Sequence, residues 1–435
     1  MARGSNEPLY IQINQKLGGH AYMDSLSCSI FKVPNPLREI NEKAYEPQVI
    51  SIGPYHYGKE HLKAMEVHKM NSLKSLLDQT GENSVEKYVT ALRNMEDEAR
   101  KIYSEPLGDI AGNILIEMML LDGCFIIELL FESTVSNRLT DFHLGKIMRD
   151  LLLIENQLPF SVLCELYSLS SGQPLDTAKH CVADKAISFY NKMMPGSPIN
   201  EATPHQDVKH LLGLLHLFYS SEQRPVSIEL GILPRSSAPA VPESSPRQPS
   251  PTKRKFIHYA TKLEEAGIKF QKNGGRLFHI EFRKGVMSIP TLEINDDTES
   301  IFRNLVAYEQ CYKGISSKCF TNYVIIMDRL INTGKDVELL CHHGVLQNWL
   351  GDHEVVATMF NRLCDCVSIS DTDLFYSEIF EKVNEHCNRK WNLWKANLWH
   401  NYFNSPWALI SFIAAVFLLL FAMLQALFSV LSYNK

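Results

Sequence analysis

The 435-residue sequence has few of the features that mark a secreted chain. It contains no N-x-S/T glycosylation sequon, and residues 1–30 hold no continuous apolar stretch of the kind found in a signal peptide, because Pro8, Asn14 and Gly18 interrupt them. Its 10 cysteines include no C-x-x-C pair. These absences favour reduced thiols and a body on the cytosolic side of any membrane.

Strong positive charge is also absent. The formal net charge is −6, and the densest basic run is the short stretch 253–255, which borders a proline-rich segment. Proteins that bind nucleic acid carry a basic face or stripe. We therefore predict no nucleic-acid partner.

Sequence signatures of catalysis are missing as well. Neither the G-x-S-x-G turn of hydrolases nor the G-x-G-x-x-G turn of dinucleotide-binding proteins occurs. A near match to a phosphate-binding loop begins at Gly53, but Pro54 has no N–H to offer a phosphate, and Glu60 stands where a magnesium-binding Ser or Thr belongs. The stretch predicts a tight aromatic turn.

The histidines do not form a metal-binding pattern along the chain. His205, His210 and His216 are five and six residues apart, and these spacings do not point a pair at one ion. His342 and His343 are adjacent and face different directions in any regular element. We assign no catalytic, cofactor-binding or metal-binding residue and no cofactor, and we expect a protein that is not an enzyme.

Hydrophobic periodicity predicts a mainly α fold with a small β-hairpin or meander, an α+β class. The expected helices cover 110–131, 142–167, 207–219, 259–266, 297–312, 323–332 and 352–364, and the expected strands cover 268–270, 277–282 and 286–294. The stretch 110–131 is apolar, but Glu117, Asp122 and Glu128 favour a buried soluble helix over a membrane span. Pro159 must kink or restart the helix over 142–167, since it lacks the N–H that would bond to Glu155.

The C-terminal segment predicts a transmembrane helix. Residues 407–432 carry no formal charge, and about 20 such residues suffice to cross a bilayer. The predicted anchor includes Trp407, Leu419, Gln425 and Ser432. A buried core helix is the alternative. The basic residues before the segment, compared with Lys435 alone after it, place the body in the cytosol. We expect a single-pass, tail-anchored protein of the plasma membrane or endoplasmic reticulum, with the lipid bilayer as a partner.

Composition divides the chain into an N-terminal arm (1–27), a mostly helical part (28–233), a proline-rich disordered insertion (234–252), a second part with short strands and then helices (253–400), and the transmembrane helix (406–432). Within the insertion, Ser245 and Ser250 each precede a proline and are candidate sites for proline-directed kinases. Phosphate there would add negative charge beside the basic run 253–255.

Several motifs occur in a fixed order along the chain. They are CSIFKVP from Cys28, PQVISIGPYHYG from Pro47, MMLLDGCF from Met118, DLLLIENQLPF from Asp150, ATKLEEAG from Ala260 and NLVAYEQ from Asn304. Together they resemble the plant family known as domain of unknown function 247, also called uncharacterised protein family 0481. The resemblance runs from about Cys28 to the final helix.

The resemblance implies a mostly helical body with a C-terminal anchor and supplies no catalytic residue or cofactor. Some grass members of the family are pollen-side determinants of self-incompatibility, which suggests recognition. We therefore expect a membrane-tethered, non-enzymatic module for protein interaction, recognition or signalling, with an unknown protein partner and unknown oligomeric state. The alternatives are an enzyme acting at a membrane surface and a self-incompatibility determinant.

Overall fold

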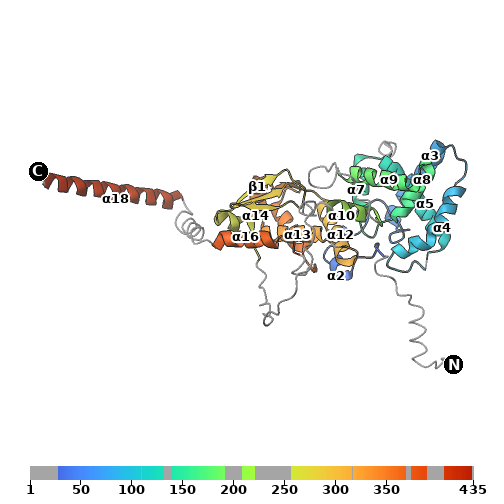
Figure 1. Ribbon diagram of the computed structural model, residues 1–435, viewed down its shortest axis with the longest axis horizontal. Helices are drawn as coiled ribbons and strands as arrows, with labels where there is room; N and C mark the ends of the chain where they lie inside the picture. The colour runs from blue at the N-terminus through green and yellow to red at the C-terminus, as the bar shows by residue number, and fades with distance from the viewer. Residues whose placement is uncertain are drawn as a thin grey trace, which may run out of the picture. The chain divides into compact units, whose positions relative to one another are not determined.

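The structure is a computed structural model that describes residues 28–108, 110–131, 139–191, 208–220, 256–315, 317–368, 374–388 and 406–433. The predicted arm (1–27), the proline-rich insertion (234–252) and the phosphosites Ser245 and Ser250 lie outside the described residues. The chain forms two compact units (Figure 1). The first comprises residues 1–240, 295–325 and 362–373, and the second comprises residues 241–294, 326–361 and 374–435.

The described part of the first unit is helical. Its elements are α2 (Asn35–Arg38), η1 (Glu42–Ala44), η2 (Glu60–Met65), α3 (Glu66–Thr80), α4 (Glu86–Ile102), α5 (Gly112–Phe131), α7 (Asp141–Asp150), α8 (Phe160–Ser171), α9 (Leu175–Tyr190), α10 (Leu211–Ser220), α12 (Thr298–Cys311) and the start of α13 (Cys319–Leu330). Helix α5 is buried from Met118 to Leu130 and packs against α3, α4, α8 and α9, which surround it in Figure 1. The prediction of a buried soluble helix over 110–131 is confirmed.

Local sequence explains where these helices begin and end. Helix α3 stops at Gly81, whose φ of 66° lies in the left-handed region that glycine adopts without strain. Thr140 accepts a hydrogen bond from the backbone N–H of His143 and caps the start of α7. Pro159 precedes the first residue of α8, so the predicted restart at this proline is confirmed. Residues 151–159 between α7 and α8 are not helical.

The second unit combines short strands with helices. The elements are α11 (Ala260–Glu265), β1 (Lys269–Asn273), β2 (Glu281–Arg283), β3 (Val286–Pro290), β4 (Leu292–Ile294), α14 (Gly334–His342), β5 (Leu346–Asn348), α15 (His353–Leu363, of which the last two residues belong to the first unit), α16 (Ser377–Asn388) and α18 (Pro406–Tyr433). One sheet has the order β1-β3-β2, and β4 pairs with β5 in a second. A mainly helical fold with small sheets is thus confirmed.

The strand pairing differs in part from the prediction. Strands β2 and β3 form an antiparallel hairpin, whose turn uses positive φ angles at Lys284 and Gly285. Strand β1, however, pairs with β3 in parallel, so the three strands do not form a meander. The parallel pairing requires a crossover connection, and period-2 alternation carries no information about it.

The C-terminal prediction needs a correction. A helix does form at the predicted place, α18. Within the described residues, however, no helix is both long enough and apolar enough to cross a membrane. The prediction of a transmembrane anchor at Trp407, Leu419, Gln425 and Ser432 is therefore wrong for this structure. The predicted bilayer partner and single-pass localisation are wrong with it.

Candidate functional site

The motif segments at 47–58 and 150–160, about a hundred residues apart in the sequence, meet in a buried polar network. Asp150, the last residue of α7, accepts backbone N–H bonds from Gln48 at 2.9 Å, Val49 at 2.7 Å and Ile50 at 3.1 Å. Arg149 lies 2.8 Å from the same carboxylate and also donates to the carbonyl of Glu46 at 2.7 Å. Burial raises the pKa of Asp150, while these donors oppose the rise.

The side-chain amides of Asn156 and Gln157 also form hydrogen bonds with the main chain. Asn156 accepts the N–H of Ile52 at 2.7 Å and donates to the carbonyls of Ile50 at 3.1 Å and Asp150 at 3.0 Å. Gln157 donates to the carbonyls of Leu151 at 2.7 Å and Leu153 at 2.9 Å. Carbonyls at the end of a helix have no partner within it. Asn156 therefore satisfies the last carbonyl of α7, and Gln157 satisfies carbonyls of the buried turn that follows the helix.

A charged cluster surrounds His56, which is buried. Its two ring nitrogens lie 3.6 Å from carboxylate oxygens of Glu46 and Glu155. Arg38 forms ion pairs with both carboxylates, and Lys59 forms one with Glu46. Burial, reinforced by the charge of Lys59, lowers the pKa of His56 to about 4. The imidazole is therefore neutral at pH 7, which leaves Arg38 and Lys59 as the cations of the cluster.

A buried ion pair fixes the aromatic turn on its other side. Lys69 lies 2.6 Å from Asp122, and the second oxygen of Asp122 accepts the N–H of Gly53 at 2.8 Å. Gly53 has a φ of 70°, and a Cβ at this position would lie 2.5 Å from the carbonyl oxygen of Gln157. Only glycine fits this close approach without strain. The motif glycine therefore has a packing role, and no phosphate is needed to explain it.

Together these contacts decide what the network can do. Asp150, Asn156 and Gln157 each bind main-chain groups, and Asp122 binds Lys69 and the Gly53 N–H. A catalytic acid or base needs an oxygen directed at a substrate. Because these oxygens and amides are buried and already bonded, the network holds the fold and does not present a reactive group.

A second cluster lies among α10, α12 and α13 of the first unit. The Nε2 atom of His216 lies 2.8 Å from Oε1 of Glu309, and the Sγ atom of Cys319 lies 3.5 Å from the same oxygen and 4.0 Å from the nitrogen. All three side chains are buried. Burial raises the pKa of the Cys319 thiol well above its usual value, so a free thiolate nucleophile is disfavoured.

A cavity of about 380 Å³ opens beside this cluster. His216 lines it, together with Gly213, Tyr308 and Tyr312. The ring of Tyr308 meets that of His216 edge to face, with 5.5 Å between the ring centroids. The cluster therefore borders a space that could hold water or a small ligand.

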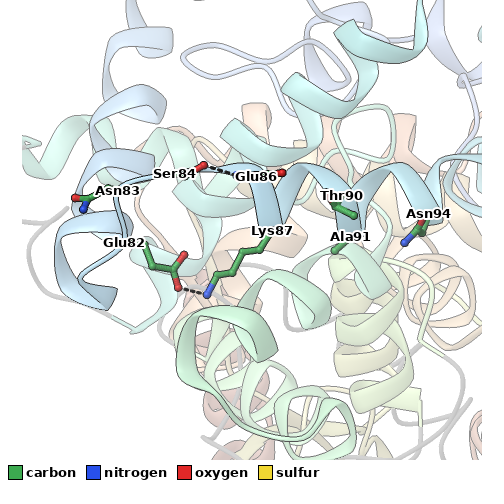
Figure 2. A pocket seen from close by; sticks show the side chains of 8 residues that line it. All are labelled: Glu82, Asn83, Ser84, Glu86, Lys87, Thr90, Ala91 and Asn94. Atoms are coloured by element: carbon green, nitrogen blue, oxygen red, sulfur yellow. Dashed lines mark hydrogen bonds and ion pairs between the residues drawn. The ribbon is translucent and has the colours of Figure 1, made fainter.

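A third feature is an open pocket at the start of α4, shown in Figure 2. Glu82 and Lys87 point toward one another there and form an ion pair, while Asn83 points away. Lys87 also donates to the carbonyl of Leu169 at 3.0 Å. The lysine of this pocket is therefore already bonded, and the charged side chain that lines it besides this ion pair is the exposed carboxylate of Glu86.

Some of these residues belong to sequence motifs or histidine clusters, but the sequence alone assigns them no site. His216 was rejected because of its spacing from the other histidines, and neither Glu309 nor Cys319 was considered with it. Glu309 and His216 are separated by 93 residues, and no local pattern can reveal that they meet. The proposed phosphosites stay predictions.

The fold and the buried network first define a class: a mainly helical protein with small sheets, whose motif residues bind its own backbone. The comparisons then give the family. The family model described as a plant protein of unknown function, DUF247, matches residues 30–421. The chain belongs to this family, as its motifs predicted.

Two curated relatives come from Arabidopsis thaliana. The UPF0481 protein At3g47200 is 32% identical over 434 residues, covering 94% of this chain and 87% of the relative. The putative UPF0481 protein At3g02645 is 24% identical over 494 residues, covering 93% of this chain and 90% of the relative. No solved structure matches this chain.

Proposed function

We propose that this member of a plant family of unknown function is a non-enzymatic interaction module that binds another protein through Trp349. The observation that carries the proposal is the exposure of this side chain, 72%, in the second unit. Tryptophan, tyrosine and arginine are enriched at the energetic centres of protein interfaces. An exposed one is a strong candidate for an anchor.

The backbone around Trp349 is held firmly. Its N–H donates to the carbonyl of Ile294 at 2.9 Å, directly after β5 pairs with β4. On one side, Asn348 accepts the N–H of Leu350 at 2.8 Å, and on the other, Asp352 accepts the N–H of Glu354 at 2.8 Å. Side chains of this type fix turns by bonding the backbone two residues on. A fixed turn loses little conformational entropy when a partner binds.

The surroundings indicate the chemistry of the partner. Val355 is also exposed, at 51%, and Asp352 and Glu354 are exposed acids in the same short stretch. Covering the exposed part of a tryptophan provides on the order of 3 kcal/mol. The expected partner is a protein with an apolar pocket for the indole and a basic rim for the two acids.

The buried network supports a non-enzymatic role. Its carboxylates and amides are those of the motifs at 118–125 and 150–160, and each is bonded to the main chain or to a buried cation. An enzyme would present at least one such group to its substrate. The motifs are explained by the need to hold the fold.

The test compares Trp349→Ala with the wild type and with Phe142→Ala, which removes a similarly exposed ring from the first unit. Tagged full-length chains are purified from plant cells, and each co-purifying protein is then assayed for binding as a purified pair. Because the proposal places Trp349 at the energetic centre of the interface, Trp349→Ala should weaken binding roughly 30-fold or more. Its melting temperature should be unchanged. A partner that binds Trp349→Ala and the wild type equally would refute the role of Trp349.

A further inference from the structure

Three buried side chains of metal-ligating type converge at α10, α12 and α13. His216 offers an imidazole nitrogen, Glu309 a carboxylate oxygen and Cys319 a sulfur, and these atoms lie within 4.8 Å of one another. The proposed interaction through Trp349 uses none of them. The proposed function therefore does not explain why an imidazole, a carboxylate and a thiol meet in the core.

The separations of the three atoms lie near those that a zinc ion requires. Zinc–ligand distances of about 2.0–2.3 Å in a tetrahedron place neighbouring donor atoms about 3.4–3.6 Å apart. The observed separations are 2.8 Å, 3.5 Å and 4.0 Å. Two of the three differ from the tetrahedral values by about half an ångström, which rotation of the His216 ring and of the Cys319 side chain can supply.

The carboxylate is oriented independently of the other two groups. Glu309 accepts the backbone N–H of Phe320 at 2.9 Å and that of Thr321 at 2.7 Å. Such outer hydrogen bonds fix a metal-ligating carboxylate in place and raise metal affinity. The first turn of α13 therefore holds Glu309 beside Cys319 whether or not His216 contacts it.

Charge also balances at such a site. Binding of a divalent ion to the cluster displaces the proton of the Cys319 thiol to solvent, and the sulfur becomes a thiolate. One thiolate and one carboxylate then neutralise the two positive charges, while the imidazole stays neutral. A buried site with no net charge avoids the large penalty of a buried ion.

We infer that His216, Glu309 and Cys319 form a zinc-binding site with its fourth position directed to the cavity beside His216. The mixed nitrogen, oxygen and sulfur donors suit zinc, whereas magnesium and calcium take oxygen ligands only. The cavity of about 380 Å³ leaves room for a water molecule as fourth ligand. The ion would join α10 to the consecutive helices α12 and α13, since His216 and Glu309 are 93 residues apart in the sequence.

The experiment uses full-length protein purified without chelators and a cobalt titration of the metal-free form. We expect roughly one zinc ion per chain by elemental analysis, and a thiolate-to-cobalt charge-transfer band when cobalt is added. Cys319→Ala should abolish this band and weaken zinc binding about 100-fold or more, since loss of an outer hydrogen-bond partner alone costs 10–100-fold. Cys164→Ala, which removes another buried thiol in α8, should change neither.

The wild-type protein decides the question even where a variant does not fold. A metal-free wild type that stays folded and gives no thiolate–cobalt band would overturn the inference and leave the trio as hydrogen-bonded core residues. A band that persists in folded Cys319→Ala, or in the more conservative Cys319→Ser, would also overturn it. The proposed function is tested separately, because Trp349→Ala leaves all three ligands in place.

Discussion

Replacement of Asn156 by leucine is the most direct test of the buried network. Asn156 is fully buried, and leucine has the same number and branching of side-chain heavy atoms, with larger methyl groups in place of the amide oxygen and nitrogen. The change therefore removes hydrogen bonds without leaving a large cavity. It strips partners from the N–H of Ile52 and from the carbonyls of Ile50 and Asp150. No water can replace them in this setting.

The magnitude follows from those three groups. Each buried polar group left without a partner costs about 1–3 kcal/mol, so Asn156→Leu should lower the free energy of unfolding by about 3–9 kcal/mol. Proteins of ordinary stability unfold with about 5–15 kcal/mol. We therefore expect most of the folded protein to be lost, with a low soluble yield.

The assay is urea unfolding followed by circular dichroism, together with soluble yield at equal expression. Asn71→Leu, on the exposed face of α3, is the matched control and should change stability little. Asn156→Asp keeps the acceptor for Ile52 but turns a carboxyl oxygen toward two carbonyls in a buried site, so it should also destabilise the protein. If Asn156→Leu unfolds at the same urea concentration as Asn71→Leu, the network is not structural. A stable Asn156→Leu variant that had lost only partner binding would point to a functional site.

Two further predictions concern the charged residues around the aromatic turn. Because the pKa of His56 is about 4 in the folded protein and 6.5 in the unfolded chain, the unfolded state takes up a proton first on acidification. The free energy of unfolding should thus fall by about 3 kcal/mol between pH 6.5 and 4 because of His56. His56→Gln should reduce this loss, and the control His258→Gln, at an exposed position, should not. Lys69→Met leaves Asp122 buried without its cation and should cost about 3–5 kcal/mol in urea unfolding. Adding Asp122→Asn should recover part of that loss, since the amide oxygen can still accept the Gly53 N–H; no recovery would contradict the ion-pair account.

The sequence by itself determined most of the local structure. Helix α5 follows from an apolar run whose acidic residues disfavour a membrane, and Pro159 sets the start of α8 because it lacks an N–H. The motif residues also gave the family correctly. At the C-terminus the apolar run predicted a helix where α18 forms, but the predicted membrane crossing is contradicted within the described residues.

Tertiary structure alone decided which of these residues meet. Asp150 contacts a segment about 100 residues earlier, and Cys319 approaches His216 across 103 residues. Tertiary structure also decided the parallel pairing of β1 with β3 and the exposure of Trp349. Periodicity and turn chemistry depend on neighbours within a few residues along the chain. Contacts between distant segments depend on how helices pack, and that is set by the burial of the whole apolar surface at once.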